Sequence, residues 1–351
     1  MTRSRPLAVA LAAVLAAVAL GACGEKSEPA PGAGAGALEP FTVMLDYFPN
    51  ADHAGLYAAQ AAGEYEKAGL EVKIQAPPDP AAPLRLLQAG RADLAISYEP
   101  EVLLARDKGA DIVSVGALVQ KPLTSLMALP GARVRRVQDL QGKRVGTAGI
   151  PYQSAYLKTI LEEAGVDPAS VKETNVGFNL TPAMISKRVD ATLGSFWNYE
   201  GTDLRQRGRN PVILRMEQLG VPTYNELVLA TRRPALDEDG ASRVRRFLQA
   251  TARGHERLRR DPNSGIDRLL EANPDLERKL QAAAVEATLP VFFPAGDRPF
   301  GWQEPREWRA YGDWMAENGL LKRRPNGARA LTNEFLPGEG LDAGVSEAPG
   351  S

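Results

Sequence analysis

Short apolar segments alternate along the chain with longer amphipathic ones. Four early segments have the alternation or the apolar run of β-strands, at residues 41–47, 70–74, 92–97 and 111–118. Helical spacing is found between them, at residues 53–68, 83–90 and 100–108, and Gly69 ends the first of these helices. Strands that alternate with helices predict a parallel sheet with crossover helices.

The same rhythm begins again at Gly142. Strands are predicted at residues 143–147, 171–176, 189–194 and 227–230, and helices at residues 154–164 and 181–187. After Asp237 the pattern is mostly helical, with predicted helices at residues 242–258, 264–272, 276–287 and 304–318. Two α/β units followed by helices predict a protein of two lobes, with its ligand beyond the carboxyl ends of the strands in the crevice between them.

The N-terminus has the pattern of a secretory signal peptide. Arg3 and Arg5 precede an apolar run at residues 7–20, which is too short for a comfortable membrane-spanning helix. The sequence Leu-Gly-Ala before Cys23 resembles the bacterial lipobox, in which the cysteine is acylated. The alternative is a plain signal peptide in which Cys23 is incidental. We predict a signal peptide at residues 1–22 and lipidation of Cys23, which places the protein at the cell membrane, anchored on its extracytoplasmic face.

Both ends of the mature chain lack core-forming residues. Residues 23–40 are rich in Gly, Ala and Pro and predict a lipidated flexible tether, and residues 337–351 predict a disordered tail. The fold is therefore expected between Phe41 and Leu336.

Composition excludes several classes of protein. The length of 351 residues fits about two domains. The 42 basic and 43 acidic residues give a net charge of −1 without a basic stripe, so we expect no nucleic-acid partner. The single cysteine and the distant His53 and His255 argue against a metal site, and no cofactor is predicted.

Polar and aromatic side chains gather after the first predicted strand. Asp46, Tyr47, Asn50, Asp52 and His53 lie between this strand and the next helix. We interpret Asp46, Tyr47, Asn50 and His53 as ligand-binding residues, and Asp52 as able to cap the helix. The alternative is that Asn50 and Asp52 serve only as turn and cap residues and that His53 lies on the surface.

A second cluster follows the strand at residues 189–194. It comprises Trp197, Asn198, Tyr199 and Glu200. Aromatic faces stack on flat rings, while Asn and Glu offer directional hydrogen bonds, so we expect ligand binding here. The alternative places Trp197 in the core and Glu200 in the first turn of the next helix.

Weaker candidates complete the predicted site. Tyr98 and Glu99 follow the strand at residues 92–97, Tyr152 precedes a helix of the second unit, and Tyr224 lies where the chain returns between lobes. No P-loop and no G-x-S-x-G motif is found. Trp302, Trp308 and Trp314 are interpreted as packing residues.

Four segments carry a resemblance to a known family: FTVMLDYFPNADHAGLYAAQAAGEYEKAGLEV, LLQAGRADLAISYEPEVLLARDKGADIVSVGAL, DLQGKRVGTAG and RVDATLGSFWNYEG. They resemble the substrate-binding proteins of ABC importers related to thiamine-pyrimidine synthesis, the ThiY-like branch. The first and last segments are fairly specific, whereas the middle ones are shared with sulfonate, taurine and riboflavin binders.

The resemblance implies an α/β, two-lobed type II periplasmic-binding-protein fold with a hinge-bounded central cleft. Lobe 1 would comprise residues 41–129 and 225–336, and lobe 2 residues 130–224. The family's eukaryotic relatives are pyrimidine synthases that consume an active-site histidine and bound pyridoxal phosphate. When Asp93 and Gly109 are aligned with them, the lysine position reads Ser97, the histidine position reads Glu101, and residues 221–225 lack the cysteine cluster.

The leading hypothesis is a non-enzymatic, monomeric receptor that binds formylaminopyrimidine or hydroxymethylpyrimidine and delivers it to an ABC transporter permease. Within the binder class the alternative ligand is riboflavin or another small aromatic heterocycle. The alternative classes are an enzyme, which the three departures disfavour, and a structural or adhesive lipoprotein, which would not need two polar-aromatic clusters at strand ends.

Overall fold

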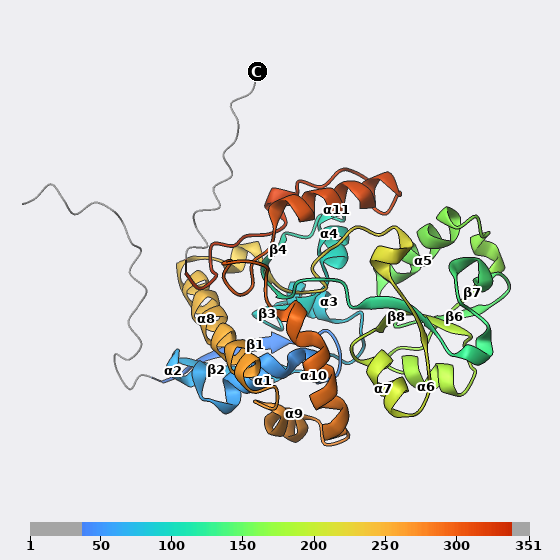
Figure 1. Cartoon of the computed structure of the whole chain (residues 1–351). Coiled ribbons are helices and arrows are strands. Elements are labelled where there is room, and N and C mark those ends of the chain that lie inside the picture. The colour runs from blue at the N-terminus through green and yellow to red at the C-terminus, as the bar shows by residue number, and fades with distance from the viewer. Residues whose placement is uncertain (1–36, 339–351) are drawn as a thin grey trace, which may run out of the picture. The chain divides into compact units, whose positions relative to one another are not determined.

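The structure is a computed structural model and describes residues 37–338. Two five-stranded sheets each form the centre of one lobe (Figure 1). The first sheet has the order β2-β1-β3-β10-β4, with strands Glu39–Met44 (β1), Leu70–Gln75 (β2), Leu94–Ser97 (β3), Ile112–Val119 (β4) and Leu227–Arg232 (β10). Here β1 is parallel to β2 and β3, whereas β10 is antiparallel to β3 and β4.

The second sheet has the order β7-β6-β8-β5-β9. Its strands are Thr124–Ala128 (β5), Arg144–Thr147 (β6), Lys172–Asn175 (β7), Ala191–Phe196 (β8) and Val212–Arg215 (β9). Because β5 is antiparallel to β8 and β9, this sheet is also mixed. The two-lobed α/β prediction is confirmed, but the prediction of purely parallel sheets is wrong, and the sequence pattern missed β5 and β9.

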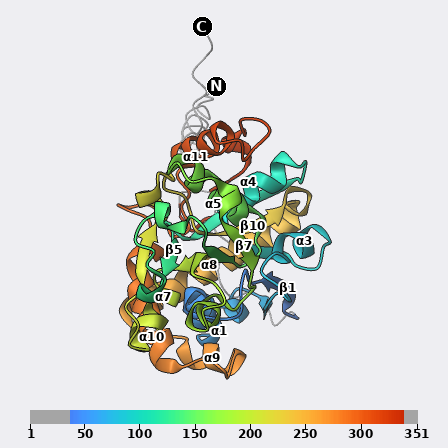
Figure 2. The ribbon, with the colours of Figure 1, turned by 90° about the vertical axis from the view of Figure 1, so that its right-hand side faces the viewer.

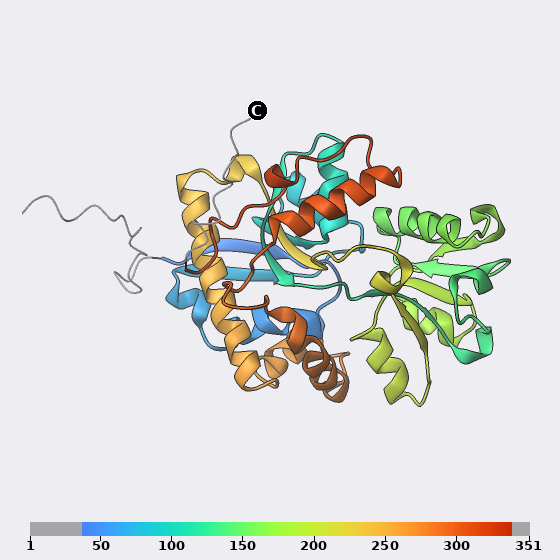
Figure 3. The same ribbon diagram turned by 45° about the horizontal axis from the view of Figure 1, so that its top comes forward.

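Helices cover the first sheet at α1 (Ala54–Ala61), α2 (Glu64–Lys67), α3 (Pro83–Gln88), α4 (Glu99–Asp107), α8 (Glu238–Arg260), α9 (Ile266–Ala272), α10 (Arg278–Phe292) and α11 (Pro305–Glu317). The predicted helix at residues 53–68 is divided into α1 and α2, because Gly63 between them has a φ of +66°. The long helix α8 packs along α1 (Figure 3). This contact is close at Gly254, where a Cβ would lie 2.2 Å from the carbonyl oxygen of Gly55. On another side of the lobe, α11 lies beside α4 (Figure 2).

The second lobe carries α5 (Pro151–Glu163), α6 (Leu180–Ile185) and α7 (Glu200–Gln206). Two segments join the lobes, at residues 120–123 between β4 and β5 and at residues 220–226 before β10. The predicted first boundary at Leu129 falls after β5, which pairs within the second sheet, so the chain crosses between sheets before Thr124. None of the helices between residues 37 and 338 is long and apolar enough to cross a membrane.

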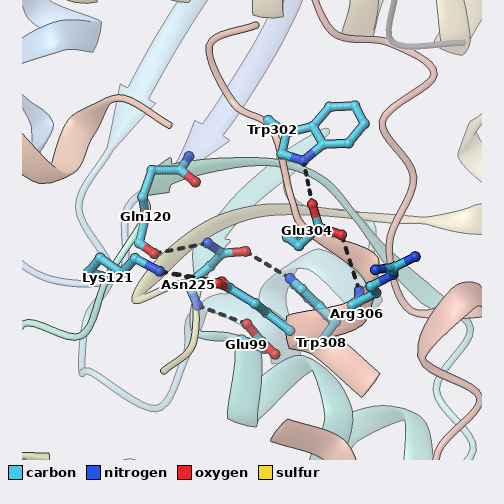
Figure 4. A network of polar contacts seen from close by, with 9 residues as sticks. Glu99, Gln120, Lys121, Asn225, Trp302, Glu304, Arg306 and Trp308 are labelled. Atoms are coloured by element: carbon cyan, nitrogen blue, oxygen red, sulfur yellow. Dashed lines mark hydrogen bonds and ion pairs between the residues drawn. The ribbon is translucent and has the colours of Figure 1, made fainter. Parts of the chain in front are cut away.

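Asn225 ties these two joining segments together (Figure 4). Its side-chain amide donates to the carbonyl of Gln120 at 3.3 Å, and its backbone N–H donates to Oε2 of Glu99 at 2.8 Å. Its Oδ1 accepts from the indole N–H of Trp308 at 2.8 Å. Trp308 is fully buried, which confirms its interpretation as a packing residue. The neighbouring carboxylate of Glu226 accepts from the backbone N–H groups of Leu123 and Thr124 at 2.6 and 2.8 Å.

The predicted tether and tail differ in part from the structure. The strand β1 begins at Glu39, so residues 39 and 40 belong to the first sheet rather than to the tether. The predicted signal peptide, Cys23 and the tail beyond residue 338 lie outside the described residues.

Candidate functional site

A cavity lies between the lobes, where β1, β3, β6 and β8 reach their carboxyl ends. Both lobes line it, with residues Asp46, Tyr47, Asn50, Asp52, Tyr98, Ala148, Ile150, Gln153, Leu180, Gly194, Phe196, Tyr199 and Glu200. The empty space is about 380 Å³ including solvent at its mouth, a volume in the range of small-molecule pockets.

Asp46 organises the first wall. Its carboxylate accepts a hydrogen bond from the hydroxyl of Tyr98 at 2.7 Å and contacts Nε2 of His53 at 2.8 Å. Nδ1 of His53 accepts the backbone N–H of Asn50 at 3.2 Å, which assigns the imidazole proton to Nε2. Both carboxylate oxygens are thus occupied within the protein. His53 does not line the cavity, and its hydrogen bond holds the carboxylate of Asp46 in place.

Asn50, and not Asp52, caps the short helix Ala51–His53 (η1). Its Oδ1 accepts from the backbone N–H of Asp52 at 2.8 Å, and its amide donates to the carbonyl of Phe48 at 3.0 Å. The prediction that Asp52 caps the helix is therefore wrong. Loss of such a cap costs about 1 kcal/mol, so the side chain of Asn50 contributes to stability.

Asp52 points its carboxylate away from its own helix. Oδ1 accepts from the side-chain amide of Asn198 in the second lobe at 2.6 Å, and the same amide contacts Oγ1 of Thr288 at 2.6 Å. Oδ2 is buried and has no hydrogen-bond partner within residues 37–338. Burial raises the pKa of Asp52 to about 6, although His53, Asn198 and Thr288 oppose the shift. Asn198 itself does not line the cavity.

Glu200 is the first residue of α7 and faces the same cavity. Its Oε2 accepts the backbone N–H of Phe196 at 2.7 Å. Burial raises the pKa of Glu200 to about 8, with the charges of Asp52 and Asp203 adding to the shift. Burial therefore favours the protonated, hydrogen-donating form of Glu200 more strongly than that of Asp52.

Aromatic rings line the space around these carboxyl groups. Tyr47, Phe196 and Tyr199 are part of the wall. Tyr47 packs edge-on against Phe178 of the second lobe, with 4.6 Å between the ring centroids. The hydroxyl of Tyr199 accepts from the amide of Gln281 at 3.2 Å. The cavity therefore combines flat apolar surfaces with a few directional polar groups, as small-molecule sites do.

Gln153 and Gly194 form a tight contact in the second wall. The Oε1 of Gln153 accepts the backbone N–H of Ala148 at 2.8 Å. Gly194 has a φ of +106°, and a Cβ there would lie 2.2 Å from Nε2 of Gln153. Gln153 belongs to the loop from which only Tyr152 was predicted as a ligand residue, and its signal in the sequence was its place after a predicted strand and before a helix.

Trp197 lies outside the cavity lining. Its indole N–H donates to the carbonyl of Pro122 at 2.9 Å, and the guanidinium of Arg215 stands 4.0 Å above its ring. The preceding residue, Phe196, presents its ring to the cavity instead.

Three weaker candidates also lie away from the cavity wall. Glu99 belongs to the network around Asn225 (Figure 4), and burial raises its pKa well above the ordinary value. Tyr152 and Tyr224 are fully buried, and the hydroxyl of Tyr224 donates to Glu226 at 3.1 Å. Of the twelve predicted ligand residues, those that line the cavity are Asp46, Tyr47, Asn50, Tyr98, Tyr199 and Glu200.

The fold is that of periplasmic binding proteins. The periplasmic aliphatic sulphonate binding protein of Escherichia coli superimposes with a TM-score of 0.63 at 17% identity, covering 83% of this chain and 97% of that one. The chain also matches the family described as NMT1/THI5 like over residues 50–264, and it belongs to that family.

Two relatives show how this family divides. A formylaminopyrimidine-binding protein of Halalkalibacterium halodurans is 34% identical over 290 residues, which cover 82% of this chain and 88% of the relative. A 4-amino-5-hydroxymethyl-2-methylpyrimidine phosphate synthase of Legionella pneumophila is 27% identical over 299 residues, covering 84% of this chain and 92% of the relative. The resemblance drawn from the sequence is thereby confirmed.

Proposed function

We propose that this protein is a lipid-anchored extracytoplasmic receptor that binds an aminopyrimidine precursor of thiamine, formylaminopyrimidine or hydroxymethylpyrimidine, and delivers it to an ABC importer. One observation carries the proposal. The buried carboxyl groups of Asp52 and Glu200 face one cavity that aromatic rings line from both lobes.

The hydrogen-bonding pattern of an aminopyrimidine is complementary to these groups. The ring offers an exocyclic N–H donor and ring nitrogens that accept. The unpartnered Oδ2 of Asp52 accepts from the amine, and the protonated carboxyl of Glu200 donates to a ring nitrogen. Asn50 is not assigned to the ligand, because its side chain is engaged locally.

The empty space of about 380 Å³ favours a single ring over the three fused rings of riboflavin. A binding role is also supported over synthase activity. By the resemblance drawn from the sequence, Ser97 and Glu101 stand where the synthases have their lysine and histidine, and the hydroxyl of Ser97 donates to Glu101 at 2.6 Å. Ser97 has no amine with which to bond pyridoxal phosphate, so these residues do not fit that cofactor.

Titration calorimetry with hydroxymethylpyrimidine, formylaminopyrimidine, riboflavin and taurine tests the proposal. We expect the two pyrimidines to bind and Asp52→Asn to weaken them at least tenfold, about 1.4 kcal/mol. Glu200→Gln keeps a donor and should change affinity little, whereas Glu200→Ala should weaken binding. The exposed Glu286 of α10 provides a matched control, Glu286→Gln. Failure of both pyrimidines to bind the parent contradicts the proposal.

Anchoring is tested separately, because Cys23 lies before the described residues. The variant Cys23→Ser should fold and bind ligand normally but no longer associate with membranes. Retention of this variant on membranes after salt and carbonate washes would exclude lipidation of Cys23 as the anchor.

A further inference from the structure

Glu226 is a fully buried carboxyl group that lies where the chain passes between the lobes, and it does not line the candidate cavity. Its Oε2 accepts from the backbone N–H groups of Leu123 and Thr124 at 2.6 and 2.8 Å and from the hydroxyl of Tyr224 at 3.1 Å. Its Oε1 accepts from the hydroxyl of Thr124 at 2.8 Å. Buried hydrogen bonds from several directions hold the carboxyl group and the backbone of Leu123 and Thr124 in one arrangement.

The contact continues from Thr124, the first residue of β5, to the second wall of the cavity. Thr124 pairs with Phe196 at the end of β8, and the carbonyl of Leu123 accepts the backbone N–H of Trp197 at 3.0 Å. Phe196 lines the cavity, and its backbone N–H donates to Glu200 at 2.7 Å. A displacement of Leu123 and Thr124 would therefore move two groups that face the ligand.

On its other side, Glu226 is joined to the first wall of the cavity. The strand β10 begins directly after Glu226, and its Val228 pairs with Ser97 at the end of β3. Ser97 directly precedes Tyr98, which lines the cavity. Glu226 therefore connects the strand end that carries Tyr98 with the strand end that carries Phe196.

We propose that Glu226 is a positioning residue for ligand binding, whose carboxyl group fixes the wall that contains Phe196 relative to the wall that contains Tyr98. This inference rests on the proposed function, because it concerns the affinity of the cavity for a pyrimidine. Since Glu226 does not line the cavity, its effect on affinity should pass through the ring of Phe196.

Removal of the carboxyl group tests the inference. Titration calorimetry with hydroxymethylpyrimidine and formylaminopyrimidine should show that Glu226→Ala binds about tenfold more weakly than the parent. In a Phe196→Ala background the same substitution should weaken binding at most about twofold, because the ring that Glu226 positions is already absent. Glu226→Gln should bind within about threefold of the parent, since its amide oxygen can accept both backbone N–H groups and its amide nitrogen can donate to the hydroxyl oxygen of Thr124.

Two tyrosine variants give a matched comparison that does not depend on the folding of Glu226→Ala. Tyr224→Phe removes one 3.1 Å hydrogen bond to Glu226, and Tyr65→Phe removes one 3.1 Å hydrogen bond to Thr251 inside the first lobe. Both tyrosines are fully buried, so denaturant unfolding should show similar losses of stability. Only Tyr224→Phe should also weaken pyrimidine binding, by about threefold.

The outcomes separate this inference from the proposed function. Parent-like affinity in Glu226→Ala, or in Tyr224→Phe if the alanine variant does not fold, would overturn the inference and leave the proposed function intact. A tenfold loss that persists in the Phe196→Ala background, or equal weakening of binding by Tyr65→Phe, would overturn it in the same way. A parent that binds neither pyrimidine contradicts the proposed function and, with it, this inference.

Discussion

The side-chain amide of Asn198 donates a 2.6 Å hydrogen bond to Oδ1 of Asp52, and the two residues belong to different lobes. The same amide contacts Thr288 on α10. Both contacts are buried, so water does not compete with them. Asn198 therefore joins the lobes directly beside the candidate ligand cavity without lining it.

We expect Asn198→Ala to speed ligand dissociation about tenfold, since it removes this inter-lobe bond and leaves Asp52 without its donor. Stopped-flow displacement measures the rate. Asn263→Ala, at an exposed loop position, is the control. An unchanged dissociation rate in the Asn198 variant would show that the bond does not hold the lobes around ligand.

The raised pKa of Glu200 predicts a pH-dependent stability. Burial shifts this pKa from 4.5 to about 8, so between these values the unfolded chain releases a proton that the native protein retains. The stabilising contribution is complete below the unfolded pKa and is lost as the pH rises through about 8, with a slope of at most about 1.4 kcal/mol per pH unit. Denaturant unfolding across this range should show a shallower decline for Glu200→Gln than for the parent. The other buried carboxyl groups are present in both proteins, so their contributions cancel in the comparison. Parallel profiles of unfolding free energy against pH would therefore show that the pKa of Glu200 is not raised.

Gly194→Ala should damage the second wall of the cavity. The added Cβ would lie 2.2 Å from Nε2 of Gln153, and the φ of +106° strains any other residue. We expect a loss of about 1–3 kcal/mol in unfolding free energy and a weakened affinity for pyrimidines. Gly208 also has a positive φ, +70°, but open space surrounds it, so Gly208→Ala reports backbone strain alone. Equal behaviour of the two variants would show that the contact with Gln153 is unimportant.

Substitutions of Trp197 and Phe196 should affect the free energy of unfolding and the ligand affinity separately. Trp197→Ala removes the bond to Pro122 and the contact with Arg215, so it should lower the unfolding free energy by about 2 kcal/mol and leave ligand affinity unchanged. Phe196→Ala, which removes a ring from the cavity wall, should weaken pyrimidine binding by about 1–3 kcal/mol. Calorimetry and denaturant unfolding on both variants give the comparison, and a reversed result would place Trp197 in the binding site.

Much of the fold could be predicted because strands β1 to β4 and helices such as α8 have strong periodicity. The strand β5 was missed because its five residues, Thr124–Ala128, form neither an apolar–polar alternation nor an unbroken apolar run. The antiparallel direction of β5 and β10 depends on pairing with strands distant in sequence, which a local pattern does not contain. The sequence thus predicted the two α/β units but not the mixed order of the sheets.

The site was predicted to the level of the strand ends but not of individual side chains. Phe196 and Trp197 are adjacent and both aromatic, and successive side chains of an extended chain point in opposite directions, so the pattern could not select between them. Asp52 has the position of a common helix cap, and only the bonding of Asn50 shows that its carboxylate is free to reach the second lobe.

The place of β10 between β3 and β4 also determines the order in which the lobes can form. All strands of the second sheet come from one continuous stretch, residues 124–215, whereas the first sheet needs residues 227–232 at its interior. During synthesis from the N-terminus, β3 and β4 therefore have unpaired edges until the second lobe and β10 have been made. The second lobe can fold before the first, and a chain that stops after β9 would leave the first sheet open to pairing with other chains.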